Sequence, residues 1–253
     1  MRSYSRVVFF FCLIWAASVA FAQDEAPAAP SSSEPTSAQA PIPAITPAAP
    51  PVPVKADALE LYRQGRSLEA AGKMADARAK YKTAVSICDQ ELAGDPSRMD
   101  AYAVKCWCLF RLELYQEVLD VGKTGLKIKY DPRLSETMGE AYYHLGNLDL
   151  ALKNLQRYIE TVGEYGDRVS TAYFYMAETY LRLKKYDHAD IAYSLAVRRE
   201  PSMARWWYRY GQTVEALKDY KRAADLYSRA LRLSPEMKDA AEGLERVRAQ
   251  VGP

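Results

Sequence analysis

The feature that most constrains the fold of this chain is a spaced pattern that returns five times between residues 58 and 250. In the copy that begins at Gly139, Tyr142 follows at offset +3, Ala151 at +12, Leu155 at +16 and Tyr158 at +19. The other copies begin at Gly65, Cys106, Ala177 and Gly211, and keep apolar or small residues at these offsets. A repeat of this kind indicates that one local unit is stacked several times.

Each copy predicts two helices that are joined by a tight turn. Offsets of +3 in the first block, and of +4 and +7 in the second, place apolar residues on one face of a helix. Polar breaks such as Gly146-Asn147 and Lys184-Lys185 separate the two blocks. The small residues let paired helices approach closely. Large residues at offset +16 fill the layer between repeats, namely Tyr81, Leu155, Tyr193 and Tyr227.

Helix starts are marked by a capping side chain that precedes a proline. This pattern occurs at Asp95-Pro96, Asp131-Pro132 and Ser234-Pro235. The stretch 236–250 then carries apolar residues on one face and charged residues elsewhere. Because a stack leaves its last apolar face open, we expect this stretch to be a capping helix. Eleven helices are therefore predicted.

The pattern resembles the tetratricopeptide repeat family, whose unit has about 34 residues. The fifth copy carries the family's signature at Trp207, Tyr210, Gly211, Ala223, Tyr227, Ala230 and Pro235. The resemblance implies an all-α fold, a right-handed superhelical solenoid of five helix-turn-helix repeats plus a C-terminal capping helix. The domain would span residues 56–251. Its repeats would lie at about 58–94, 97–130, 132–164, 168–200 and 202–234, followed by the cap at 236–250.

The repeats depart from the family pattern in three places. The first and second copies start 41 residues apart, because the second helix of the first copy is longer. The second copy holds Cys106 and Gly122 where small and aromatic residues are usual. A longer connection, Gly163 to Asp167, separates the third and fourth copies. These departures affect local curvature.

Residues 1–22 are typical of a secretory signal peptide. Arg2 and Arg6 precede a run of 16 apolar residues, which closes with Ala20-Phe21-Ala22. This small-x-small ending favours cleavage. The alternative is an uncleaved membrane anchor, although about 20 apolar residues are needed to span a bilayer. We therefore expect an exported protein, with the periplasm as its destination.

Residues 23–55 predict a disordered linker. They hold nine of the chain's 14 prolines and no aromatic residue. Such a segment cannot bury enough apolar surface to offset its ordering entropy. Two interpretations stay open, a spacer that holds the repeats away from a tether and a plain N-terminal tail.

Composition argues against several classes of function. Without residues 1–22 the chain would hold 32 basic and 32 acidic residues, so it lacks the basic excess of a nucleic-acid binder. The two histidines, His144 and His188, form no metal or catalytic pattern, and no phosphate-binding glycine loop occurs. We expect no enzyme activity, no cofactor and no metal. Contact with a membrane would arise only through a partner or an uncleaved signal anchor.

Three cysteines follow the signal segment, and thiols tend to pair in exported proteins. Cys106 and Cys108 lie two residues apart on one helix and point to different faces. Antiparallel helices folded about the turn near Asp95 would bring Cys88 close to Cys106. A Cys88–Cys106 disulfide is one hypothesis. Buried free thiols that serve as small apolar residues are the other.

The family resemblance also implies a binding surface, because the first helix of each unit lines a concave groove in this family. We call the residues at those positions the predicted groove. It consists of Tyr62, Arg66, Trp107, Phe110, Glu140, Tyr143, Phe174, Glu178, Arg205, Tyr208 and Gln212. Some of them would instead pack between helices.

The chemistry of the predicted groove favours binding of a protein segment. Tyrosine, tryptophan and arginine often carry the binding energy of protein interfaces. The Lys and Asn residues with which related domains clamp acidic chaperone tails are absent, so an extended or helical segment is expected. The expected function is a non-catalytic protein–protein interaction scaffold or assembly factor in the bacterial cell envelope. The alternative is a ligand-binding accessory subunit of a transport system.

Overall fold

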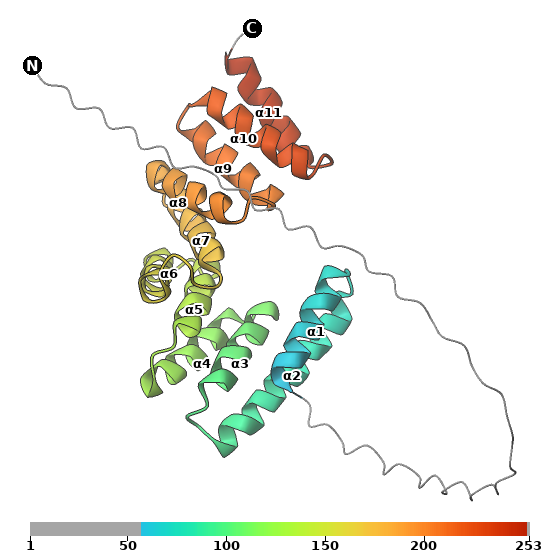
Figure 1. The fold of residues 1–253 in the computed structure, drawn as a ribbon, viewed down its shortest axis with the longest axis vertical. Helices are drawn as coiled ribbons and strands as arrows, with labels where there is room; N and C mark the ends of the chain where they lie inside the picture. Colours follow the sequence, from blue (N-terminus) through green and yellow to red (C-terminus); the bar gives the residue numbers. More distant parts are fainter. Residues whose placement is uncertain (1–56, 252–253) are drawn as a thin grey trace, which may run out of the picture. The chain divides into compact units, whose positions relative to one another are not determined.

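The computed structural model describes residues 57–251, which form eleven α-helices and no strand (Figure 1). The helices are α1 (Ala58–Ala70), α2 (Met74–Gly94), α3 (Met99–Arg111), α4 (Tyr115–Ile128), α5 (Pro132–His144), α6 (Leu148–Val162), α7 (Val169–Arg182), α8 (Tyr186–Arg199), α9 (Ala204–Ala216), α10 (Tyr220–Leu233) and α11 (Lys238–Val251). The predicted signal peptide (1–22) and linker (23–55) lie outside the described residues. Within the described part, none of the helices has the length and apolar character needed to cross a membrane.

The helices stack in the order of the chain. Each helix packs against the next, and α1, α3 and α5 each also pack against the helix two further along the chain, whereas α7 and α9 meet through side chains such as Glu178 and Arg209. We call α1, α3, α5, α7 and α9 the first helices. Contacts confined to neighbouring repeats are the mark of a solenoid. The predicted all-α repeat solenoid is confirmed.

The paired helices meet where a small residue faces a large one. A Cβ atom added to Gly211 would lie 2.7 Å from the Tyr227 ring, so only glycine allows this approach of α9 to α10. Tyr227 is fully buried and its hydroxyl donates to Glu215, 2.5 Å away. The large residues at offset +16 therefore fill the core as the sequence predicts.

The turns within the helix pairs share one backbone conformation. The second residue after each first helix takes a left-handed conformation, and it is glycine in only two of the five turns, at Gly72 and Gly146. The other three turns place Glu113, Lys184 and Lys218 there, with φ between 58° and 65°. Because a side chain is strained in this region, these three turns hold a small amount of strain.

The predicted helix starts are confirmed at one of three sites. Asp131 caps α5 by accepting a hydrogen bond from the Arg133 amide at 2.9 Å, and Pro132 is the first helical residue. Asp95 instead accepts from the amide and the hydroxyl of Ser97 within a turn, and α3 begins only at Met99. Ser234 likewise precedes a turn and donates to Glu236. These two Xaa-Pro pairs start turns, because the polar side chain forms a hydrogen bond two residues along the chain and does not cap a helix.

Within residues 57–251, Cys88, Cys106 and Cys108 are buried and free, so the Cys88–Cys106 disulfide is not formed in the structure. Cys88 packs in the same apolar cluster as Cys108, whereas Cys106 packs in the neighbouring cluster. Burial raises the pKa of the Cys88 thiol to about 12. The thiols therefore stay protonated and pack as small apolar side chains.

Candidate functional site: a cavity along the first helices

A cavity of about 530 Å³ is lined by side chains from all five first helices and the segments that flank them. Its aromatic lining consists of Tyr62, Trp107, Phe110, Phe174, Tyr175 and Trp206. Its charged lining consists of Arg66, Arg111, Glu140, Arg168 and Glu200. The cavity therefore combines apolar rings with charges of both signs.

The structure divides the predicted groove into two sets. Six of its members line the cavity, namely Tyr62, Arg66, Trp107, Phe110, Glu140 and Phe174. The other five lie elsewhere: Tyr143, Glu178, Arg205, Tyr208 and Gln212. Arg205 points to solvent, and the remaining four join a hydrogen-bond network within the protein.

Aromatic pairs form two walls of the cavity. The ring centroids of Tyr62 and Trp107 lie 5.5 Å apart, which joins α1 to α3. Those of Phe174 and Trp206 lie 4.9 Å apart in a stacked arrangement, which joins α7 to α9. Such pairs hold large apolar surfaces in fixed positions at a cavity edge, where a partner side chain could pack against them.

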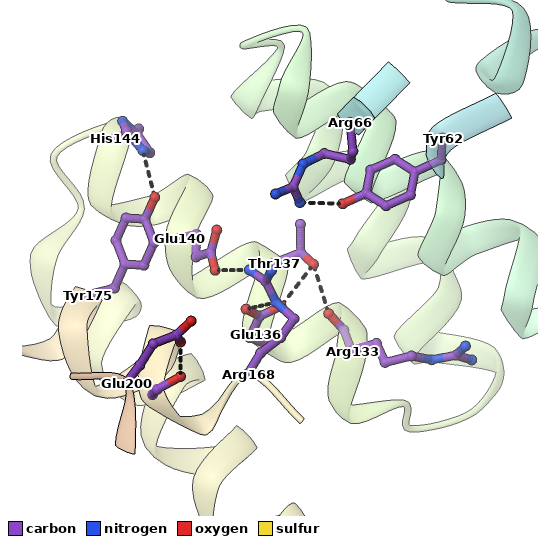
Figure 2. Close-up of polar contacts among 11 residues, drawn as sticks. Tyr62, Arg66, Arg133, Glu136, Thr137, Glu140, His144, Arg168, Tyr175 and Glu200 are labelled. Carbon is purple, nitrogen blue, oxygen red and sulfur yellow. Dashed lines mark hydrogen bonds and ion pairs between the residues drawn. The ribbon is translucent and has the colours of Figure 1, made fainter. Parts of the chain in front are cut away.

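The floor of the cavity holds a buried cluster of three charged groups. Arg168 donates to Glu136 and to Glu140, each at 2.6 Å, and only 2–3 % of either glutamate side chain is exposed. Figure 2 shows Arg168 reaching from the start of α7 to both carboxylates on α5. Burial and the neighbouring Glu136 raise the pKa of Glu140 well above its usual range. Two carboxylates therefore compete for one guanidinium.

A second buried network joins α7 to α9. Arg209 donates to both oxygens of Glu178, at 2.6 and 2.7 Å, and the hydroxyls of Tyr143 and Tyr193 donate to the same carboxylate. Burial opposes ionisation, but the hydrogen bonds from Arg209 and Tyr193 outweigh it and lower the pKa of Glu178. Arg209 also donates to Gln212, which in turn donates to Tyr208. These predicted groove residues thus join three successive repeats through α5, α7 and α9.

The two networks belong to a series that we call the inner ladder. At each junction between successive first helices, and between α9 and α11, an arginine of the later element pairs with a carboxylate of the earlier one. The pairs are Arg111–Glu69, Arg133–Asp100, Arg168–Glu136/Glu140, Arg209–Glu178 and Arg246–Glu215. In four of the five, nitrogen and oxygen lie 2.6–2.8 Å apart.

The first junction is the exception. Arg111 lies 3.7 Å from the Oε2 atom of Glu69, and Arg66 lies 3.5 Å from the same oxygen. That oxygen also accepts the hydroxyl of Tyr81 at 3.0 Å. Two guanidinium groups at the cavity edge therefore share one loosely held carboxylate.

Sequence reasoning missed the arginines of the inner ladder and the lining residues Tyr175, Glu200 and Trp206. A signal for the ladder exists, because Glu178–Arg209 and Glu215–Arg246 are each separated by 31 residues, close to one repeat. Glu200 follows the last residue of α8, a position that the helix pattern leaves unassigned.

The two histidines take no part in the cavity. His144 stacks on Tyr115, with ring centroids 4.5 Å apart, and His188 packs against Tyr180. Burial and the nearby Arg182 lower the pKa of His144. It is therefore neutral near pH 7 and acts as one more aromatic ring.

Parts of the chain match models of a known repeat family. Models of the tetratricopeptide repeat match residues 174–238, 61–87 and 137–162. Among solved structures, YrrB, described as a TPR protein with an unusual peptide-binding site, is 21 % identical with a TM-score of 0.52. The alignment covers 75 % of this chain and 92 % of YrrB.

Two further solved structures share the fold. A thermophilic TPR protein of Thermus thermophilus is 19 % identical with a TM-score of 0.56, over 75 % of this chain and 98 % of that one. The MamA protein is 18 % identical with a TM-score of 0.50, over 71 % of this chain and 92 % of MamA. At these identities the likeness establishes the solenoid architecture.

Proposed function

We propose that this chain, parts of which match models of the tetratricopeptide repeat, is a non-catalytic protein–protein interaction scaffold that binds a segment of a partner protein in the cavity. The observation that carries the proposal is the cavity lining, in which aromatic and arginine side chains converge from α1, α3, α7 and α9 and the segment before α7. Residues of these types dominate the binding energy of protein interfaces when they are held rigidly. The description of YrrB as peptide-binding supports a peptide-like ligand here.

The pre-organised lining favours a partner segment over a whole folded surface. Stacked pairs such as Phe174–Trp206 are fixed by contacts within the protein, so little side-chain entropy is lost on binding. A cavity admits one extended or helical segment, whose side chains fill the spaces between the rings. Affinity would then come from a few aromatic anchors.

We further propose that the scaffold works in the bacterial cell envelope, in the periplasm, as an assembly factor. The support is the sequence of residues 1–22, with its two arginines, its apolar run and its Ala-Phe-Ala ending. N-terminal sequencing of the protein from periplasmic extract checks this placement. A mature chain that begins at Gln23 is expected, and an intact Met1 in a cytosolic fraction would refute it.

The second candidate function is that of a ligand-binding accessory subunit of a transport system. It is favoured by the size of the cavity, about 530 Å³, which is within the range of small-molecule sites, roughly 300–1,000 Å³. Native mass spectrometry of protein purified from its source distinguishes the two functions. A bound small molecule supports this alternative, and its absence together with a co-purifying protein supports the scaffold.

Site-specific photo-crosslinking tests the scaffold directly. A photoreactive amino acid replaces Phe110 in the cavity and, in a matched control, Ile191 on α8, whose side chain is 63 % exposed and away from the cavity lining. The same partner protein should be captured in cells at position 110 and not at position 191. Equal capture at both positions, or capture at position 191 alone, would show that partners use another surface.

A further inference from the structure

The charged groups that line the cavity fall into three sets along the stack. Arg66 and Arg111 come from α1 and α3, and Glu140 with Arg168 occupies the middle. Glu200 lies beyond them, directly after α8. Figure 2 shows Arg66 and Glu200 on opposite sides of Arg168. The cavity therefore has two charged ends and a charged floor.

Each charged group of the floor already has a partner within the protein. Each carboxylate there contacts Arg168 at 2.6 Å, and both glutamate side chains are almost fully buried. The geometry leaves the guanidinium committed to these two oxygens. A bound segment would meet a satisfied cluster in the middle of the cavity, and it would gain little by pairing with it.

The end at α1 and α3 carries unbalanced positive charge. Arg66 and Arg111 share only Glu69, at 3.5 and 3.7 Å, whereas the other pairs of the inner ladder lie at 2.6–2.8 Å. Their side chains are 43 % and 28 % exposed. Guanidinium groups in such a position can bind an additional carboxylate in a bidentate manner.

The opposite end carries unbalanced negative charge. Among the described residues, Glu200 has no ion-pair partner, and its side chain accepts one hydrogen bond, from the Ser170 hydroxyl at 2.9 Å. It is half-buried and faces the cavity beside Met203 and Trp206. An external cation would therefore find an unpaired carboxylate here.

We propose that the cavity selects a partner segment with an acidic side chain at one end and a basic side chain at the other. The acidic side chain binds Arg66 and Arg111, the basic side chain binds Glu200, and apolar residues between them pack on Trp107 and Phe174. This inference rests on the proposed function and gives it a direction, because a segment inserted the other way would place like charges together. Charge complementarity of this kind sets orientation and specificity more than total affinity.

Selection from a random dodecapeptide library displayed on phage tests this proposal. The full chain is used in four forms: wild type, Arg66→Glu with Arg111→Glu, Glu200→Arg, and a control that carries Lys82→Glu and Glu117→Arg. The control residues are exposed on α2 and α4 and do not line the cavity. Circular dichroism verifies folding of each form, and Trp107 and Trp206 report peptide binding by their fluorescence.

Wild type and control should enrich the same peptides, in which an acidic and a basic residue flank apolar ones in one order. Those peptides should bind each charge-reversed form at least tenfold more weakly. The arginine-reversed form should lose the acidic preference alone, and the Glu200→Arg form the basic preference alone.

Enriched peptides that bind all four forms within twofold would overturn this inference and leave the proposed function standing. Failure of wild type to enrich any peptide would count against both. Enrichment of acidic residues alone, with no effect of Glu200→Arg, would refute the two-ended arrangement.

Discussion

The α5–α7 and α7–α9 junctions use the same kind of ion pair and reach opposite electrostatic outcomes. At α5–α7, one guanidinium serves two buried carboxylates, and the pKa of Glu140 is raised. At α7–α9, one guanidinium and two tyrosine hydroxyls serve a single carboxylate, and the pKa of Glu178 is lowered. At α5–α7, burial and the neighbouring carboxylate outweigh the single guanidinium, whereas at α7–α9 the hydrogen bonds from Arg209 and the tyrosines outweigh burial.

The largest loss of stability should follow removal of the arginine at the α7–α9 junction. Arg209→Met leaves Glu178 buried without its counter-ion, and we expect a loss of about 3–5 kcal/mol in the free energy of unfolding at pH 7. Arg168→Met leaves Glu136 and Glu140 together but should cost less, because Glu140, whose pKa is already raised, can take up a proton and share it with Glu136 in a hydrogen bond. Urea denaturation followed by circular dichroism measures both.

Arg205→Met is the matched control for the larger effect. Arg205 lies one turn before Arg209 on α9 but is exposed, so its replacement should change stability by less than about 0.5 kcal/mol. Equal losses for Arg168→Met and Arg209→Met would contradict the difference between the junctions.

Replacement of each glutamate by glutamine should change the free energy of unfolding in opposite directions. Glu178→Gln removes a charge that accepts four hydrogen bonds and should cost about 2 kcal/mol at pH 7. Glu140→Gln keeps an acceptor for Arg168 but removes a disfavoured charge, so it should stabilise the fold by about 1 kcal/mol.

The pH dependence of these variants runs in opposite directions. The pKa of Glu178 is lowered on folding. Its contribution to the stability of the fold is therefore present above its unfolded pKa, about 4.3, and is lost as pH falls. The pKa of Glu140 is raised on folding. Its contribution to the stability of the fold is therefore fully present below about pH 4.3 and is lost as pH rises through the folded pKa. Urea denaturation between pH 4 and pH 8 should show that Glu178→Gln and Glu140→Gln differ from wild type in the free energy of unfolding by amounts that diverge as pH rises. Parallel curves would contradict the assignment.

The smallest effect concerns the connection that leads into the α5–α7 junction. Gly163 ends α6 with φ 70° and ψ −173°, a conformation that is largely restricted to glycine. Gly163→Ala should cost about 1–2 kcal/mol, with faster amide hydrogen exchange near Arg168 and no change at Glu178. Gly94→Ala, at the end of α2 with a negative φ and open space around it, is the control. Equal exchange changes at both junctions would show that the connection does not act locally.

The sequence predicted the helices and the side of the stack that forms the cavity. The offsets of Tyr81 and Tyr227 fix which face of α2 and α10 is buried, because helical periodicity is a local property. The direction of Trp107 and Phe174 followed from the family resemblance, and both line the cavity.

Other residues could not be placed from local pattern. Glu178 and Tyr143 have the character of surface groove residues, yet Glu178 accepts hydrogen bonds from Tyr143 and from Arg209 across two repeat boundaries. Such pairings depend on the rise and rotation between repeats, which determine which side chains meet. Asp95 failed as a helix cap for a related reason, since the competing contact with Ser97 satisfied it first.

Every pair of the inner ladder has the same direction, with the carboxylate earlier in the chain and the arginine later. During synthesis, the carboxylate residue of each pair is therefore translated before the arginine that neutralises it. Truncation after α8 would strand Glu178 without Arg209, whereas loss of α1 would leave only the partly solvated Arg111 unmatched. Shortening the array from its C-terminal end is consequently the more damaging change, and each newly made repeat is completed by the one that follows it.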